Sequence, residues 1–192
     1  MTDNDVIDKI NNVLPQTQCR QCTYKDCLSY AKAIVKGDRL DRCIPGADAT
    51  IIDIAKIVNK DPSPFLNKII KKESKKVIID SNNCIGCIKC IMACPVDAII
   101  GSRQNLHEII EDECTGCNLC IPACPTDCII ETNEDTNYSF DKAKHRYEAK
   151  VKRLDKDDSF KSNIENSTVS IKLKQDYINK VLKKDVIKSK NS

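Results

Sequence analysis

Two stretches of this sequence share one cysteine pattern. CIGCIKCIMACP occupies residues 84–95, and CTGCNLCIPACP occupies residues 114–125. Both read C-x2-C-x2-C-x3-C-P, and the longer segments 84–100 and 114–130 are identical at 11 of 17 positions. Such a match within one chain indicates an internal repeat, so each copy is expected to form the same local structure.

The spacing fits a cubane iron–sulfur cluster. A [4Fe-4S] cube needs four thiolates around its irons, and three closely spaced cysteines on a tight loop can hold one face of it. Gly86 and Gly116 are expected to let each loop turn without a side chain that strikes the cluster. Zinc is the alternative, but zinc sites mostly use two C-x2-C pairs on a longer loop or include histidine. The tandem motifs therefore favour iron–sulfur clusters.

This region resembles the bacterial two-[4Fe-4S] ferredoxins, in which the fourth cysteine of each motif binds the other cluster. The resemblance implies one set of ligands, Cys84, Cys87, Cys90 and Cys124. It implies a second set, Cys114, Cys117, Cys120 and Cys94. A pseudo-twofold ferredoxin domain would be completed by short strands at 77–80, 98–100, 107–110 and 128–130.

Other polar and thiol side chains of the region are expected to be structural. Cys128 replaces an alanine of the first copy, and we expect a small buried hydrophobe rather than a ligand. Asp97 and Asp127 are expected to cap turns. His107 and His145 have no ligand-like neighbours in the sequence, and no role is assigned to them.

Four further cysteines lie near the N-terminus, with the spacing C-x2-C-x4-C-x15-C: Cys19, Cys22, Cys27 and Cys43. This spacing leaves an iron–sulfur cluster and a zinc ion open. The cluster is favoured, because the same chain already carries two cubane motifs. Apolar periodicity and helix-ending residues predict helices at 4–14, 28–38 and 47–59 around these cysteines.

LPQTQCRQCTYKDCLSYAKAIVKGD (14–38), followed by RCIPG (42–46), resembles the N-terminal iron–sulfur domain of the B subunit of the Rnf-type electron transport complex. In that family this domain precedes two ferredoxin motifs, as it does here, and the resemblance extends over about residues 7–135. It implies a third [4Fe-4S] cluster, on Cys19, Cys22, Cys27 and Cys43. Thr23 and Asp26 stand where the family commonly has glycines, and the hydrophobic anchor with which its members commonly begin is not found.

Composition sets the expected organisation. The chain has 192 residues with 13 cysteines, no tryptophan and only 4% aromatic residues, so clusters are expected to supply much of the core. We expect an α+β protein. Its predicted parts are a helical four-cysteine domain at 1–60, a linker at 61–76, the ferredoxin-like domain at 77–135 and a charged helical or disordered basic tail at 136–192.

The cysteines and the N-terminus predict a reduced compartment. The odd cysteine count argues against a disulfide framework, and MTDNDVIDKINNVLPQ lacks the basic start and apolar core of a signal peptide. No apolar run reaches the ~18 residues of a membrane helix. We therefore expect a cytoplasmic protein, with a peripheral position on the cytoplasmic face of the inner membrane left open.

Charge is uneven along the chain. Residues 1–140 hold 16 basic and 20 acidic side chains, whereas residues 141–192 hold 15 basic and 8 acidic ones. Helices are expected at 142–154 and in the amphipathic stretch 167–190. A solvated, partly disordered extension is favoured, and a docking surface for an acidic redox partner or anionic lipid is the alternative. Nucleic acid is not favoured, because the tail lacks an organised aromatic pattern.

The residues indicate an electron carrier rather than a catalyst. No side chain stands out as an acid, base or nucleophile, and no G-x-G loop provides a seat for a dinucleotide. The resemblance implies a relay of single electrons through three [4Fe-4S] clusters, with redox proteins and other subunits of an Rnf-type complex as partners. A freestanding soluble ferredoxin-like carrier is the alternative, and a redox or iron sensor is a third hypothesis.

Overall fold

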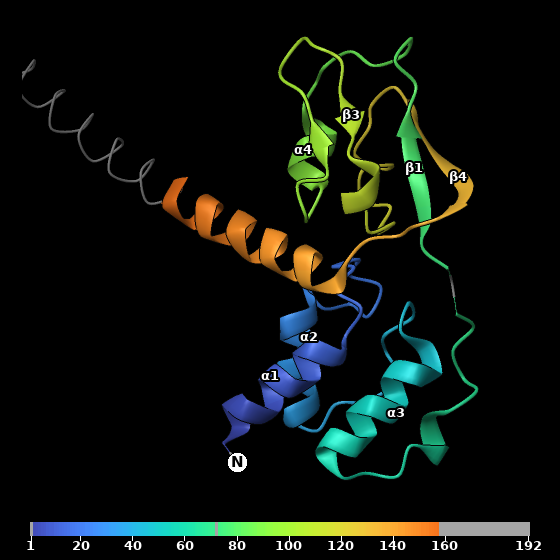
Figure 1. Ribbon diagram of the computed structural model, residues 1–192, viewed down its shortest axis with the longest axis vertical. Helices are drawn as coiled ribbons and strands as arrows, with labels where there is room; N and C mark the ends of the chain where they lie inside the picture. Colours follow the sequence, from blue (N-terminus) through green and yellow to red (C-terminus); the bar gives the residue numbers. More distant parts are fainter. Residues whose placement is uncertain (1, 72, 158–192) are drawn as a thin grey trace, which may run out of the picture. The chain divides into compact units, whose positions relative to one another are not determined.

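The structure is a computed structural model that describes residues 2–71 and 73–157 (Figure 1). Within these ranges the chain forms short helices and two small sheets. The helices are α1 (Asp3–Val13), α2 (Cys27–Val35), α3 (Ala47–Val58) and α4 (Lys89–Ala93), with 3-10 turns η1 (Ser63–Phe65) and η2 (Glu111–Glu113). The strands are β1 (Lys75–Ile79), β2 (Ile99–Ile100), β3 (Glu108–Ile109) and β4 (Ile129–Asp135).

The chain divides into two units, residues 1–150 and 151–192. Of the second unit, only 151–157 are described, and they continue a helix that begins at residue 140. The amphipathic stretch predicted at 167–190 lies outside the described residues. The first unit contains all the cysteines.

The three N-terminal helices pack around an apolar core. The Thr2 hydroxyl accepts the Asp5 N–H at 3.3 Å, and the Asp5 carboxylate accepts the Thr2 N–H at 2.8 Å, so donors at the start of α1 are satisfied. α1 packs against both α2 and α3 (Figure 1). The side chains buried between these helices include Ile10, Leu14, Tyr30, Ile34, Ile51 and Ile54.

The repeat forms two antiparallel pairs of strands. β1, which precedes the first motif, pairs with β4, which follows the second, and Ile79 lies opposite Ile129. β2 follows the first motif and pairs with β3, which precedes the second, with Ile99 opposite Ile109. Each pair of strands therefore joins the two copies of the repeat to one another.

The two motifs also share their local backbone. Positions thirty residues apart adopt left-handed φ angles that agree closely: Gly86 (65°) and Gly116 (63°), Ile88 (60°) and Asn118 (60°), Asp97 (52°) and Asp127 (52°). Aspartate enters this region more readily than most residues, in line with the turn role predicted for the last pair. Equal spacing in the sequence has thus produced equal turns in space.

The elements predicted within the described residues are present, with ends that differ by a few residues. β1 begins at Lys75, so the last two residues that we placed in the linker belong to a strand. The helix predicted at 142–154 extends over 140–157. The prediction of a solvated tail is wrong for residues 140–150, because Ala143 and Lys150 are buried and Ala143 joins the core of the repeat.

Candidate iron–sulfur centres

A small cavity brings together cysteines from both motifs. Three come from the first motif and one from the end of the second: Cys84, Cys87, Cys90 and Cys124. Most of the remaining lining is apolar, from Ile79, Ile85 and Ile129, with His107 and Cys128 in addition. We call this space the first cavity. It contains the first cysteine set that the ferredoxin resemblance implied.

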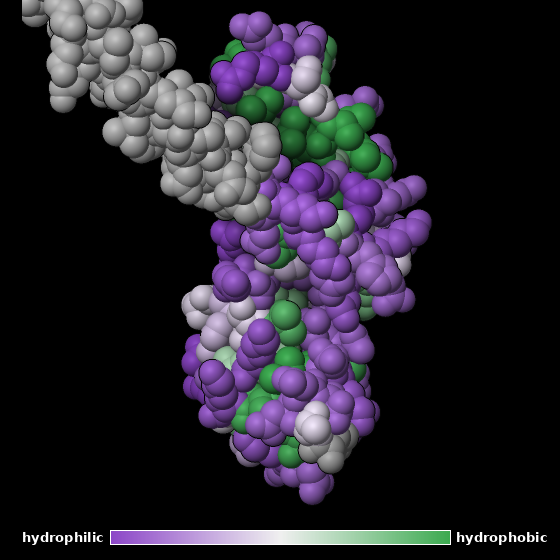
Figure 2. Space-filling model, turned by 90° about the vertical axis from the view of Figure 1, so that its left-hand side faces the viewer, coloured by the Kyte–Doolittle hydropathy of each residue, from purple (hydrophilic) through white to green (hydrophobic). Residues whose placement is uncertain are grey.

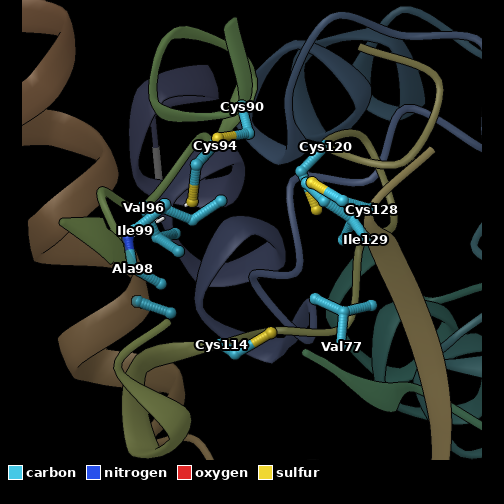
Figure 3. Packing of buried hydrophobic residues seen from close by; sticks show 11 residues of the cluster. Val77, Cys90, Cys94, Val96, Ala98, Ile99, Cys114, Cys120, Cys128 and Ile129 are labelled. Carbon is cyan, nitrogen blue, oxygen red and sulfur yellow. Dashed lines mark hydrogen bonds between the residues drawn. The ribbon is translucent and has the colours of Figure 1, made fainter. Parts of the chain in front are cut away.

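A second small cavity contains the complementary set. Its cysteines are Cys94, Cys114, Cys117 and Cys120. Figure 3 shows Cys94 and Cys114 in this part of the core with Val96 and Ile99. The sulfur of Cys94 also accepts a hydrogen bond from the backbone N–H of Ala98 at 3.2 Å. Each cavity therefore has three cysteines of one motif and the fourth cysteine of the other.

The short helix α4 separates the fourth cysteine of the first motif from the other three. Cys90 and Cys94 lie one turn apart, and their side chains point in different directions (Figure 3). Cys90 lines the first cavity and Cys94 lines the second. Pro95 follows at once, and its ring prevents the helix from continuing. A single turn of helix thus places neighbouring cysteines in two different cavities.

Both loop glycines are required by neighbouring backbone. A Cβ on Gly86 would lie 2.7 Å from the backbone nitrogen of Asn105, and a Cβ on Gly116 would lie 2.7 Å from the carbonyl oxygen of Lys75. The left-handed φ angles add a second requirement, because side chains make that region unfavourable. The positive φ angles agree with the predicted turns, and the adjoining backbone gives a further reason for glycine at both positions.

The four N-terminal cysteines lie near one another as well. Cys19 and Cys22 are on the loop between α1 and α2, Cys27 begins α2, and Cys43 shortly precedes α3. Burial raises the pKa of the Cys27 thiol, and the other three cysteines raise it further. The backbone N–H of Cys27 donates to the Gln18 side chain at 2.9 Å, which ties the loop to the start of the helix.

Burial makes these thiols weak acids. It raises the pKa of Cys43 and Cys120 to about 12, and that of Cys90 and Cys117 to about 11. Metals bind the thiolate form, so loading the sites must release protons. Among the described residues, no group of three or more Cys, His, Asp or Glu side chains is placed to hold a single metal ion. Four sulfurs around an apolar space are instead the donor set that an iron–sulfur cube uses, and the residues fit that group.

Known protein families match both cysteine regions. Residues 77–130 match a family described as a 4Fe-4S dicluster domain, and residues 14–45 match a family described as an Fe-S cluster. The first range contains both motifs of the repeat, and the second contains the four N-terminal cysteines. The comparison thus assigns iron–sulfur chemistry to the two regions that the geometry singled out.

Individual relatives show which kind of iron–sulfur protein the chain resembles. The chain is 50% identical over 107 residues to the B subunit of the ion-translocating oxidoreductase complex of Haemophilus influenzae (strain PittEE), a match that covers 56% of this chain and 55% of that protein. It is 48% identical over 113 residues to the protein of the same name from Escherichia coli O9:H4 (strain HS), covering 57% and 59%. Over the matched residues, the chain is similar to this B subunit. It spans little more than half the length of these relatives. None of the helices in the described ranges combines the length and apolar character needed to cross a bilayer.

His107 is a candidate site residue that the sequence did not reveal. Its side chain is buried, and Nδ1 lies 3.2 Å from the sulfur of Cys90. A hydrogen bond to a ligating sulfur stabilises the thiolate and tunes the bound metal. Only the fold brings these residues together, because seventeen positions separate them and neither periodicity nor motif spacing connects them. His145 is exposed.

The N-terminal cysteine loop contacts the wall of the second cavity. Thr115 lines that cavity, and its hydroxyl donates to the carbonyl of Thr17 at 3.1 Å, two residues before Cys19. Tyr138 donates to the carbonyl of Pro15 at 2.6 Å. Burial raises the pKa of Tyr138, and cysteines of both regions raise it further, which places this ring near both sites.

Apolar side chains gather on the surface of the region that contains the repeat, in the upper part of Figure 2. The large apolar residues there with at least half of their surface exposed include Ile78, Ile85, Met92, Ile100, Leu106 and Ile130. Ile85 is 60% exposed and also lines the first cavity. The first cavity therefore lies close to the protein surface.

Proposed function

We propose that this chain relays single electrons through three [4Fe-4S] clusters as the B subunit of an Rnf-type ion-translocating oxidoreductase complex. The observation that carries the proposal is the pair of four-cysteine cavities with crossed membership, because two-cluster ferredoxins hold their cubes in this way. The identity of about one half to named B subunits supports the assignment to the complex.

Twelve of the thirteen cysteines are ligands in this proposal. The cluster of the first cavity is held by Cys84, Cys87, Cys90 and Cys124. The cluster of the second cavity is held by Cys94, Cys114, Cys117 and Cys120. The N-terminal cluster is held by Cys19, Cys22, Cys27 and Cys43. Cys128, whose sulfur lies 3.4 Å from that of Cys124, remains a thiol in the wall of the first cavity.

Bound [4Fe-4S] clusters supply one-electron chemistry, and the protein supplies fixed positions for it. α4 holds the first and second cavities one helical turn apart, through Cys90 and Cys94. The bond between Thr115 and Thr17 holds the N-terminal cysteine loop against the second cavity. These contacts support the order N-terminal site, second cavity, first cavity, with the surface at Ile85 as the place where a redox partner approaches.

The chain carries electrons in this proposal, and ion translocation belongs to the whole complex. We place it on the cytoplasmic face of the inner membrane, bound to other subunits. A freestanding ferredoxin-like carrier would have the same clusters without this association. Co-purification with membranes that contain the other subunits is the expected result, and a chain found wholly apart from them would favour the freestanding carrier.

Anaerobic iron and sulfide analysis with EPR of the reduced protein tests the relay itself. Three clusters predict about 12 irons per chain with spin-coupled signals. About 8 irons with zinc in the N-terminal region would leave a two-cluster ferredoxin with a structural module, and the three-site relay would be wrong.

A further inference from the structure

Lys150 is a buried cation on the turn that carries Cys94. Its side chain is 8% exposed. The amine donates to the carbonyl oxygens of Ile91 at 3.0 Å, Met92 at 3.4 Å and Cys94 at 2.5 Å. These carbonyls lie at the end of α4, where helix oxygens need partners and where a positive charge is favourable. Lysine is rarely buried unless it is paired, and here three backbone oxygens fix its position.

Arg146, one turn earlier on the same helix, adds a second cation. It donates to the carbonyl oxygens of Val96 and Asp97, both at 2.7 Å, and lies 3.3 Å from the carboxylate of Glu113. The carboxylate of Asp97 lies 3.1 Å from Lys150 and is the more exposed partner, with 27% of its side chain accessible. Water therefore screens the charge of Asp97 more than that of Lys150.

The equivalent turn of the second motif has different surroundings. Cys124 takes the place of Cys94 there, and its sulfur contacts uncharged groups, the hydroxyl of Thr126 at 3.5 Å and the thiol of Cys128 at 3.4 Å. The loop that holds the first cavity does contain Lys89, but this side chain is exposed, so solvent and salt weaken its field. Two sites with the same local backbone thus differ in a buried positive charge.

On the basis of the function proposed above, we propose that Lys150 selectively raises the reduction potential of the [4Fe-4S] site in the second cavity. Reduction adds a negative charge, and a close cation with little screening stabilises the reduced form more than the oxidised form. His107 acts on the first cavity through a hydrogen bond to Cys90, which is a weaker influence than a full buried charge. Lys150 therefore favours the electron at the middle site of the relay.

EPR-monitored redox titration of the full chain, loaded anaerobically with iron and sulfide, tests this role. Lys150→Met should lower the potential of one cluster, with at least a tenfold shift in its one-electron equilibrium, or about 59 mV. The signal that Cys114→Ala abolishes identifies the cluster of the second cavity. Lys150→Arg keeps the charge and should restore most of the potential. Lys89→Met is the matched control, which removes an exposed lysine and should shift either potential less.

Asp97→Asn tests the same charge by removing the carboxylate that is paired with it. This variant replaces Lys150→Met as the test if Lys150→Met does not fold. Removing the carboxylate leaves the charge of Lys150 less compensated, so the potential of the same cluster should rise. A fully loaded Lys150→Met protein with unshifted potentials, or an Asp97→Asn potential that stays or falls, overturns the role of Lys150. The two clusters of the repeat together hold about 8 irons. If the wild-type repeat does not hold both of them, the proposed function is overturned instead.

Discussion

The two cysteine-rich regions differ in what fills their interiors. The N-terminal core has ten buried apolar residues, of which only Cys43 is a cysteine. The core of the repeat has eleven, and five of them are cysteines. Helices of nine to twelve residues surround the first core, whereas strands of two to seven residues surround the second. Two-stranded sheets of this size have little stability of their own, so we expect the repeat to depend on bound clusters far more than the N-terminal helices do.

Removal of iron gives the largest expected difference between the two regions. Anaerobic chelation of the loaded chain should abolish the protection of backbone amides in residues 75–135, because thiolate ligation replaces an apolar core there. The helices α1, α2 and α3 should keep much of their protection, since their buried side chains are independent of metal. Hydrogen exchange read by mass spectrometry of peptides measures both. An equal loss in the two regions would show that the N-terminal helices also require their site.

Single cysteine substitutions test which cysteines of the repeat hold the same cluster. Cys94→Ala and Cys114→Ala should lose the same cluster, with about four irons fewer per chain, and leave the same EPR signal, because both residues line the second cavity. Cys128→Ala is the matched control, since Cys128 lies in the wall of the first cavity and should leave the iron count unchanged. If the variants at Cys94 and Cys114 lost different clusters, the crossed arrangement would be wrong.

Glycine substitutions should lower the unfolding free energy by different amounts in the two regions, and this difference should be smaller than the effects above. Gly86→Ala and Gly37→Ala both place a side chain at positive φ, which costs about 1–2 kcal/mol. At Gly86 the new Cβ also meets the backbone of Asn105 at 2.7 Å, and overpacking adds about 1–3 kcal/mol. At Gly37 nothing lies within 4 Å, so the chain can relax. Denaturant unfolding of the loaded proteins measures the loss of stability in both variants. Equal losses would mean that the loop at Asn105 moves to make room for the new side chain.

Much of this organisation could be predicted from local spacing. The flanking strands and the paired turns follow from motifs that repeat after thirty residues, and the crossed cysteine sets were implied by the resemblance to two-cluster ferredoxins. The role of the helix after β4 could not, because its charged sequence has the composition of a solvated face. The burial of Lys150 is favourable only because its amine donates hydrogen bonds to the carbonyl oxygens at the end of α4. These acceptors lie more than fifty residues away in the sequence. The contact of His107 with Cys90 could not be predicted for the same reason, because seventeen positions separate the two residues.

Tyr147→Phe should give the smallest effect, at the contact between the two regions. The hydroxyl of Tyr147 donates to Asp26 at 2.9 Å, and the Asp26 carboxylate caps α2. Losing this partly exposed hydrogen bond should cost about 1 kcal/mol of unfolding free energy without any loss of iron. Tyr24→Phe is the control, because Tyr24 bonds to Asp38 within the N-terminal region. Faster hydrogen exchange in residues 140–150 is expected only for the Tyr147 variant, and its absence would mean that this bond does not fasten the helix.

The crossed cavities also govern when the protein can receive its metal during synthesis. Once the ribosome has delivered Cys94, the first cavity has three of its four cysteines, and the fourth is still thirty residues away in the unmade chain. The second cavity at that moment has one cysteine and lacks three. The second cavity has all four of its cysteines once Cys120 has emerged, and the first cavity has them only with Cys124, so both must be filled late and almost together. A chain truncated between the motifs would leave two open sets of thiols and no finished site.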